Sequence, residues 1–215
     1  MMQKKAKKPA LFHPKRLPMD IARLVCAPLL LWYRMKKRTP DGKKYTNRIR
    51  GGGILAVNHT SFSDPFLIGV TVWYRRLFFL AAEVVMQGKL RTWLLKGVGA
   101  IKIDRKGIDI EAIRKSVDVL KEGHLLAVFP QGGISEDARI QSIKSGAVLI
   151  ALQAGVPIIP VHIFPKKHTF SRRLAVIGDA IDPQKYIENK FPSTKDIEKI
   201  SQVLMEEMNH CMISQ

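Results

Sequence analysis

Apolar and polar residues alternate in blocks along most of this chain. Short apolar runs, which are typical of strands in a covered sheet, exchange with longer stretches whose apolar residues recur every three or four positions, as in helices. The predicted strands are 54–57, 77–82, 100–103, 125–129, 157–163 and 174–177. The predicted helices are 65–74, 89–96, 109–121, 142–154 and 196–212. This exchange predicts an α/β fold in which crossover helices connect the strands of one sheet.

Composition and charge narrow the class of protein. A chain of 215 residues with 46% hydrophobic and 25% charged residues is long enough for one domain with a real core, and is not a disordered protein. The net charge is +18, but residues 1–50 hold 15 Lys and Arg against Asp20 and Asp41. Since most of the excess lies there, nucleic-acid binding by the folded surface is not expected, although a non-catalytic basic protein stays an alternative. Cys26 and Cys211 show no metal or disulfide spacing, which favours free thiols in a reducing compartment.

We expect the first 45 residues to form a segment separate from the folded domain. An apolar decapeptide, 24–33, lies between a basic tail and the basic run 34–38. Ten residues of helix reach about 15 Å, half of what a membrane span needs, and no small-residue cleavage site follows, so neither a spanning helix nor a signal peptide is expected. Trp32 and Tyr33 at its edge favour an interfacial helix on an anionic membrane surface. The alternative is a surface helix packed on its own domain with a solvated tail. We therefore divide the chain into a tail and helix at 1–45 and a folded domain at 46–215.

The most informative segment is the heptapeptide 58–64, between strand 54–57 and Pro65. It contains His59 and Asp64, an imidazole and a carboxylate five residues apart at the end of a strand, where α/β sheets bind ligands. In a straight helix the two would lie about 140° apart, so they can meet only if the chain bends, and Ser61 and Ser63 suit such a turn. An imidazole oriented by a carboxylate can act as a general base. Alternatively, Asp64 is only a helix N-cap and His59 a polar loop residue.

Three further segments stand at ends of predicted strands. Arg105 follows strand 100–103 and could hold a phosphate, or form a surface salt bridge with Asp104. The glycine turn after strand 125–129 could direct backbone N–H groups at an anion or oxyanion, or be an ordinary sharp turn. Segment 155–161 is best explained as buried sheet entered through a rigid turn.

Taken together, these segments resemble the glycerolipid acyltransferase family, which includes 1-acylglycerol-3-phosphate acyltransferases. The family's Asn-His-x-x-x-x-Asp motif is matched by Asn58, His59 and Asp64, and its arginine-bearing second motif by 103–105. Its third motif, usually Phe-Pro-Glu-Gly-Thr-Arg-Ser, corresponds to 129–135, and its fourth, Val-Pro-Ile-x-Pro-Val, to 156–161. The resemblance covers residues 50–180. It implies a mixed sheet flanked by helices, preceded here by the short membrane-associating segment.

The resemblance also implies a function and a set of site residues. It implies transfer of a fatty acyl chain from acyl-acyl-carrier protein or acyl-CoA to the hydroxyl of a lysophospholipid, most simply 1-acylglycerol 3-phosphate, without a metal or other cofactor. His59 and Asp64 would be catalytic. The substrate-binding residues would be Asn58, Arg105, Gln131, Gly132, Gly133 and Ser135.

The third motif departs from the family at three positions. Gln131, Gly133 and Ile134 replace its glutamate, threonine and arginine. Ile134 cannot hold a phosphate, so either Arg105 and backbone N–H groups suffice, or the acceptor differs. Glycerol 3-phosphate or another lysolipid is therefore an alternative acceptor.

A membrane acceptor gives the basic N-terminal segment a purpose. An apolar helix with cations on both sides would hold the enzyme, as a peripheral or monotopic protein, at the cytoplasmic face of the membrane. Apolar residues of helix 65–74 could line an acyl passage, although core packing is the favoured explanation; these are Phe66, Leu67, Ile68, Val70, Val72 and Trp73.

Overall fold

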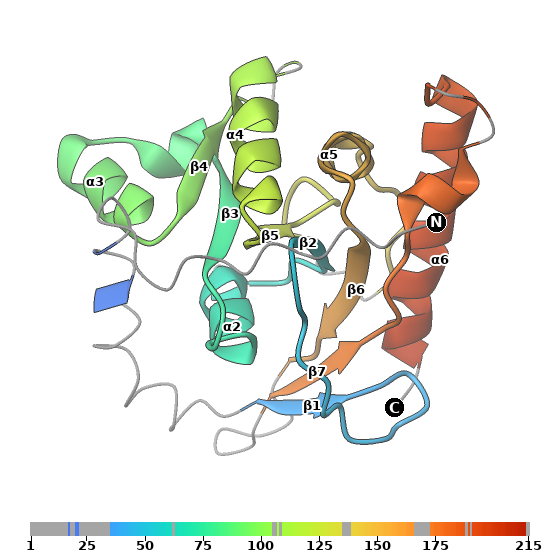
Figure 1. Cartoon of the computed structure of the whole chain (residues 1–215). Helices are drawn as coiled ribbons and strands as arrows, with labels where there is room; N and C mark the ends of the chain where they lie inside the picture. The colour runs from blue at the N-terminus through green and yellow to red at the C-terminus, as the bar shows by residue number, and fades with distance from the viewer. Residues whose placement is uncertain are drawn as a thin grey trace.

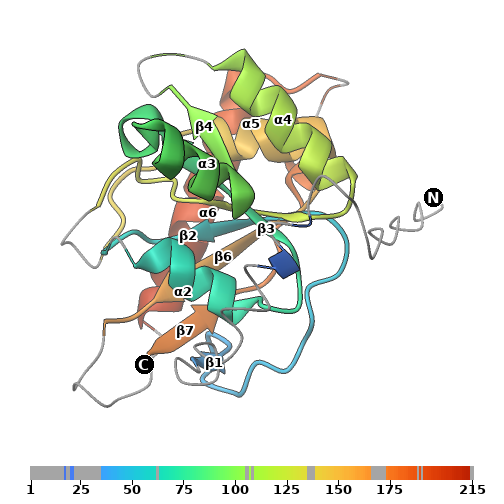
Figure 2. The same ribbon diagram turned by 90° about the vertical axis from the view of Figure 1, so that its left-hand side faces the viewer.

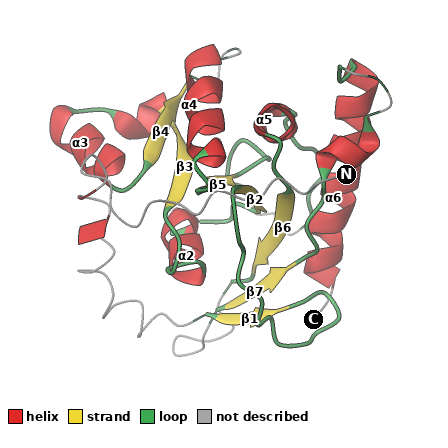
Figure 3. Cartoon of the chain, viewed as in Figure 1, coloured by secondary structure: helices red, strands yellow, loops and turns green. Residues whose placement is uncertain are grey.

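The chain folds around one seven-stranded sheet with the strand order β1-β7-β6-β2-β5-β3-β4 (Figures 1 and 3). A computed structural model describes residues 17, 20–21, 35–61, 63–104, 107, 109–134, 139–165, 173–187, 189 and 191–213, without the side chains of 70, 91 and 94. The strands are β1 (Lys36–Arg38), β2 (Gly53–Val57), β3 (Leu77–Ala82), β4 (Ala100–Ile103), β5 (Leu125–Val128), β6 (Ile158–Ile163) and β7 (Leu174–Ile177). The helices are α2 (Asp64–Thr71), α3 (Lys89–Gly97), α4 (Ile110–Lys121), α5 (Gly146–Ala154) and α6 (Thr194–Ile213), with 3-10 turns η2 (Glu83–Met86) and η3 (Pro183–Tyr186).

The sheet is mixed, as the resemblance implied. Strands β6, β2, β5, β3 and β4 pair in parallel, whereas β7 pairs antiparallel with β6, and β1 pairs in parallel with β7. Parallel neighbours require crossover connections, which α2, α3, α4 and α5 provide. The carboxyl ends of β2, β5 and β6 therefore lie at one edge of the sheet.

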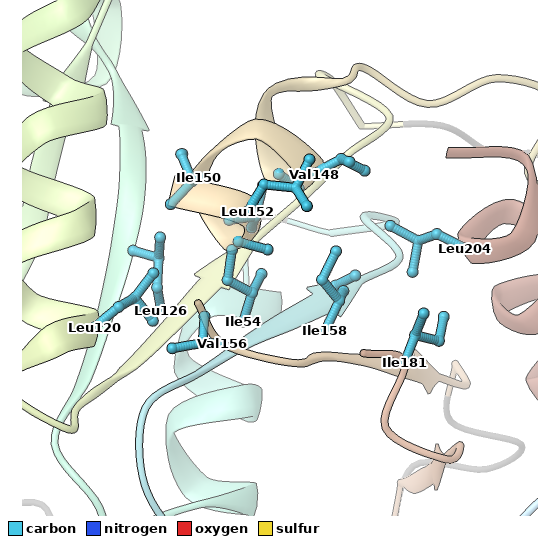
Figure 4. Packing of buried hydrophobic residues seen from close by; sticks show 14 of the residues in the cluster. Ile54, Leu120, Leu126, Val148, Ile150, Leu152, Val156, Ile158, Ile181 and Leu204 are labelled. Atoms are coloured by element: carbon cyan, nitrogen blue, oxygen red, sulfur yellow. The ribbon is translucent and has the colours of Figure 1, made fainter. Parts of the chain in front are cut away.

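The apolar side chains of β2 divide between the two faces of the sheet. Ile54 and Ala56 point into a core built with α4, α5 and α6 (Figure 4), and Leu55 and Val57 point into a second core with α2. All five residues of β2 are buried, as expected for a parallel strand covered on both faces. Gly52, just before β2, must be glycine because a Cβ there would overlap the carbonyl oxygen of Leu120 at the end of α4.

The residues of helix 65–74 that could have lined an acyl passage differ in their burial. Leu67, Ile68 and Val72 are buried in the second core, which confirms core packing for them, whereas Phe66 and Trp73 are exposed. The side chain of Val70 lies outside the described part of the chain.

The predicted elements are largely confirmed, with shifts of one or two residues at several ends and three larger differences. Helix 142–154 begins only at Gly146, because the backbone N–H of Lys144 bonds to the carbonyl of Pro130 instead of starting a helical turn. Helix 65–74 ends already at Thr71. Strand β1 was not predicted: a Lys-Lys-Arg run carries no strand signal, and its strand form comes from pairing with β7.

The N-terminal segment is only partly described. The predicted interfacial helix 24–33 lies outside the described residues, so its place stays a prediction. Asp20, however, forms a two-point ion pair with the buried Arg76, with distances of 2.6 and 3.0 Å, and so contacts the domain next to β3. Among the described residues, none of the helices has the length and apolar character that crossing a bilayer requires.

A buried histidine in β6 makes the fold sensitive to acid. Burial lowers the pKa of His162 from 6.5 to about 4, because the imidazolium would lose its hydration. The unfolded chain therefore takes up a proton that the folded one refuses, and stability should fall by up to about 3 kcal/mol as the pH drops from 6.5 to 4. Urea unfolding at pH 7, 6 and 5 measures this loss.

His162→Gln should flatten that pH dependence, because glutamine keeps polar atoms but does not titrate. His210→Gln, at an exposed position of α6, serves as the matched control and should leave the dependence unchanged. An equal slope in the His162 variant and the wild type would contradict the prediction.

Candidate active site

Residues of the heptapeptide 58–64 lie at the carboxyl end of β2, the central strand of the sheet. Ala56 pairs with Val128 of β5, and Val57 pairs with Val161 of β6. The loops that follow β2 and β5 therefore leave the sheet side by side. This is the sheet edge where open α/β folds bind their ligands.

His59 and Asp64 meet at this edge. Nδ1 of His59 lies 3.0 Å from Oδ2 of Asp64. The carboxylate is completely buried, while the imidazole keeps 13% of its surface exposed. The pair thus joins a shielded carboxylate to a ring that solvent or a substrate can reach.

Asp64 itself bends the chain between the two residues. Its Oδ2 also accepts the backbone N–H groups of Thr60 and Ser61, each at 2.7 Å. The hydroxyls of Ser61 and Ser63 lie 3.1 Å apart, and the Ser63 N–H bonds to the Ser61 hydroxyl. The predicted serine turn is confirmed, and the carboxylate is what closes it.

The alternative explanation of Asp64 as an N-cap is wrong. Helix α2 begins at Asp64, with Ser63 in the N-cap position and Pro65 in the first turn. The Asp64 side chain therefore turns back toward His59 instead of capping the residues that follow. Its negative charge in the first helical turn is still favourable for the helix dipole.

The contact with Asp64 decides which ring nitrogen of His59 can act as a base. A carboxylate only accepts hydrogen bonds, so Nδ1 carries the proton and Nε2 keeps its lone pair. The ring also stacks on Phe129 from the end of β5, with a centroid distance of 4.3 Å. Contacts from the first residue of α2 and from the residue after β5 thus fix the ring.

Gln131 connects the third-motif loop to the first. Its side-chain Oε1 accepts the backbone N–H of His59 at 3.1 Å. An amide oxygen accepts a backbone N–H as a carboxylate oxygen does, so this contact does not need a glutamate. In this structure Gln131 positions the histidine, a function that the sequence did not predict.

Gly132 and Gly133 form the turn that follows. Gly132 has a φ of +76°, which a side chain would strain, and its N–H donates to the Phe129 carbonyl. This bond closes the turn, so the prediction that the Gly132 N–H is directed at an oxyanion is not supported. Gly133 has open space around its Cα and stays a candidate donor.

Lys144 is a residue that the sequence reasoning missed. Its backbone is held to Pro130, and its side chain lies against Gly132, where an added Cβ would be 2.7 Å from Cε and 3.2 Å from Nζ. Its ammonium group therefore lies beside the glycine turn. The sequence offered no signal for it, because the predicted helix 142–154 included this lysine.

Asn58 has a different function from the predicted substrate contact. The residue is 2% exposed, its Nδ2 donates to the Ile163 carbonyl, and its Oδ1 accepts the Ile163 N–H. Both ends of the amide are thus used on the backbone of β6. We correct its assignment to a positioning residue that holds the start of the loop.

Arg173, just before β7, is a second missed residue. Its Nη1 lies 3.9 Å from Oδ1 of Asp64, the carboxylate oxygen that lacks a hydrogen-bond partner. The guanidinium thus places a positive charge beside the buried carboxylate. No motif surrounds Arg173, so the sequence alone offered no signal for it.

Two predicted site residues remain. Arg105 and Ser135 lie outside the described residues, so their functions stay predictions. Ile134 is described and exposed, and lacks a polar group, as expected. Among the described residues, no group of three His, Cys, Asp or Glu could hold a metal ion.

Comparison with known proteins identifies a family whose sequences match this chain. A family model described as acyltransferase matches residues 37–164, the stretch from β1 to the end of β6. A 1-acyl-sn-glycerol-3-phosphate acyltransferase of Bacillus subtilis is 30% identical over 110 residues, which are 51% of this chain and 54% of the relative. An enzyme of the same description from Limnanthes douglasii is 37% identical over 155 residues, which are 67% of this chain and 53% of the relative. The chain thus spans about half the length of these curated relatives.

A solved structure shares the fold. The crystal structure of the 1-acyl-sn-glycerophosphate acyltransferase PlsC from Thermotoga maritima matches with a TM-score of 0.59 and 20% sequence identity. The match covers 91% of this chain and 81% of that one. The mixed sheet and its flanking helices are therefore a known architecture.

The corrected assignment of Asn58 can be tested by unfolding. Asn58→Ala should lower the free energy of unfolding by about 1–3 kcal/mol, because two buried backbone groups of Ile163 lose their partners. Urea denaturation of Asn58→Ala and of Asn47→Ala, an exposed control, measures the difference. A stability loss no larger than that of the control would contradict the positioning function.

Proposed function

The chain belongs to the acyltransferase family, and we propose that it transfers a fatty acyl chain from an acyl thioester to the hydroxyl of a lysophospholipid. The favoured acceptor is 1-acylglycerol 3-phosphate, which gives phosphatidate. The observation that carries the proposal is the 3.0 Å contact between His59 and the buried Asp64. The descriptions of the Bacillus subtilis and Limnanthes douglasii relatives support the choice of acceptor.

The geometry suits general-base catalysis. Nε2 of His59 takes the proton of the acceptor hydroxyl, and the hydroxyl oxygen attacks the thioester carbonyl. The resulting tetrahedral oxyanion collapses, the carbon–sulfur bond breaks, and the leaving thiolate takes the proton back from the imidazolium. Asp64 keeps the ring in the required tautomer and stabilises its positive charge during the reaction. The products are an ester and a free thiol, with no covalent acyl-enzyme.

The oxyanion needs hydrogen-bond donors, and the turn after β5 supplies the nearest candidate. Since the Gly132 N–H is used within the turn, Gly133 is the candidate of the two glycines. A Cβ added to Gly133 would meet no atom within 4 Å, so a substrate carbonyl has room to approach.

Lys144 provides a cation for the acceptor phosphate. The family arginine of the third motif is Ile134 here, yet Lys144 places an ammonium group against the same glycine turn. An ammonium group binds phosphate as a point charge, although it lacks the two-point geometry of arginine. We assign Lys144, together with the predicted Arg105, to the acceptor's phosphate.

The donor and the location belong to the same proposal. Acyl-acyl-carrier protein and acyl-CoA both present the thioester that this mechanism needs. A membrane-resident acceptor favours a peripheral or monotopic protein at the cytoplasmic face of the membrane. Glycerol 3-phosphate and other lysolipids are competing acceptors, and an acceptor panel with either donor separates them, since only a true acceptor releases thiol rapidly.

The first test of the mechanism removes the base. His59→Ala should lower thiol release from acyl-CoA or acyl-acyl-carrier protein by about 10²–10⁴-fold, because proton removal from the hydroxyl loses its catalyst. Thiol release is followed with a chromogenic thiol reagent in the presence of 1-acylglycerol 3-phosphate. His210→Ala, at an exposed position of α6, is the matched control. Unchanged thiol release by a folded His59 variant would end the proposal.

The second test concerns Lys144. Lys144→Ala should raise the KM for 1-acylglycerol 3-phosphate about tenfold with little change in kcat, since the lost charge–phosphate contact belongs to binding. The KM for a phosphate-free monoacylglycerol should stay the same, and Lys144→Arg should restore the lower value. Lys121→Ala, an exposed lysine of α4, is the control. An equal KM change for both acceptors would show that Lys144 acts through the structure of the loop.

A further inference from the structure

Helix α3 leaves large apolar side chains in solvent beside lysines. Leu90 is 71% exposed and Trp93 67%, and Val84 of the neighbouring η2 is 65% exposed. Lys89 and Lys96 are exposed as well. Exposed apolar side chains that gather on one part of a surface mark an interaction site.

The arrangement around the helix is one-sided. At about 100° per residue, Lys89, Leu90, Trp93 and Lys96 fall within about 120° of the circumference, and Leu95 lies about 160° from Trp93. Leu95 packs on the small core of Ala81, Met86 and Ala100, and the Thr92 hydroxyl bonds to the Met86 carbonyl. One side of α3 thus anchors the helix to the domain, and the other presents Leu90 and Trp93 beside Lys89 and Lys96.

A groove runs along the lysine side of this face. It has a volume of about 520 Å³ and is lined by Gly88, Lys89, Thr92, Trp93 and Lys96. A groove with two ammonium groups and an indole fits a phosphate headgroup that lies beside an acyl chain. Exposed tryptophan next to lysine is typical of segments at the membrane–water interface.

The charge of the surrounding sequence supports an anionic partner. Segment 77–103 holds four Lys or Arg against Glu83 alone. That glutamate is paired with Lys102, so the two charges offset each other and three cations remain in excess. The segment around α3 therefore carries a net charge of +3.

The position of this face relative to the site is favourable. Strand β3 pairs in parallel with β5, and β5 with β2, so η2 and the start of α3 follow the same sheet edge that carries His59. Figure 1 shows α3 and α6 at opposite ends of the molecule, and in Figure 2 the side that carries α3 and α2 faces the viewer.

We propose that the exposed face of α3, with Val84 of η2, docks on an anionic phospholipid bilayer. Leu90, Trp93 and Val84 enter the interface, while Lys89 and Lys96 bind lipid phosphates. This surface is distinct from the predicted helix 24–33 and lies within the folded domain. The inference rests on the proposed function in one respect, because a lipid acceptor requires the site to face a bilayer.

Vesicle binding by the full-length protein tests the proposal. Leu90→Ser/Trp93→Ser should weaken sedimentation with phosphatidylcholine–phosphatidylglycerol vesicles about tenfold, whereas Phe191→Ser/Ile213→Ser, two equally exposed apolar residues near and within α6, should not. Lys89→Glu/Lys96→Glu should likewise weaken binding more than Lys185→Glu/Lys199→Glu, the charge-matched control. Equal effects of test and control variants would overturn the proposal.

Insertion depth gives an independent readout. With Trp32 and Trp73 replaced by Phe, the fluorescence of Trp93 should be quenched by lipids that carry bromine on the acyl chain. Unquenched Trp93 in protein that sediments with vesicles would overturn the proposal. Dimerisation that the Leu90/Trp93 variant abolishes in the absence of lipid would instead identify this face as an interface between two copies.

The failure of this inference and the failure of the proposed function are distinguishable. The Leu90/Trp93 variant should release thiol at the wild-type rate with a short-chain acceptor dissolved as monomers, because the catalytic residues are intact. A protein that binds vesicles through α3 but releases no thiol with any acceptor would sink the proposed function alone.

Discussion

The arrangement of the site depends on one buried oxygen atom, Oδ2 of Asp64. Three N–H groups converge on it, from the His59 ring and from the backbone of Thr60 and Ser61. A carboxylate without exposed surface has lost its water, and these donors replace it, with Arg173 as a nearby positive charge. The same atom therefore bends the loop, selects the histidine tautomer and keeps the helix start in place, so these properties cannot be changed separately.

The loop is also fixed from outside, by strands on both sides of β2. Asn58 ties its first residue to the backbone of β6, and Gln131 ties His59 to the loop that follows β5. Phe129 then packs on the imidazole. In the proposed mechanism, a ring held by these contacts needs little reorganisation before it accepts a proton, and such preorganised positioning is what general-base catalysis requires.

How far the sequence predicts this arrangement differs between its parts. Buried strands such as β2 and the amphipathic α4 were recognisable, because their apolar periodicity is a local signal that tertiary contacts only reinforce. The pairing of His59 with Asp64 followed from residue types and a permissible turn. Strand β1 and the late start of α5 could not be predicted, because each is made by a distant backbone partner: β7 for β1, and Pro130 for Lys144. The positioning function of Asn58 was hidden for the same reason, since only the folded sheet brings Ile163 next to it.

The unusual third motif becomes consistent when its positions are considered together. Gln131, where the family has a glutamate, accepts the His59 backbone N–H and brings no negative charge to the loop. Replacing the arginine by Ile134 removes a positive charge, so the balance of the motif is unchanged. A carboxylate at 131 would lie next to the turn on which Lys144 rests and would offset its ammonium charge. With a neutral amide there, the charge of Lys144 is not offset, which suits the proposed contact with the acceptor's phosphate. The glutamine and the isoleucine are thus best understood as one coupled change and not as two separate losses.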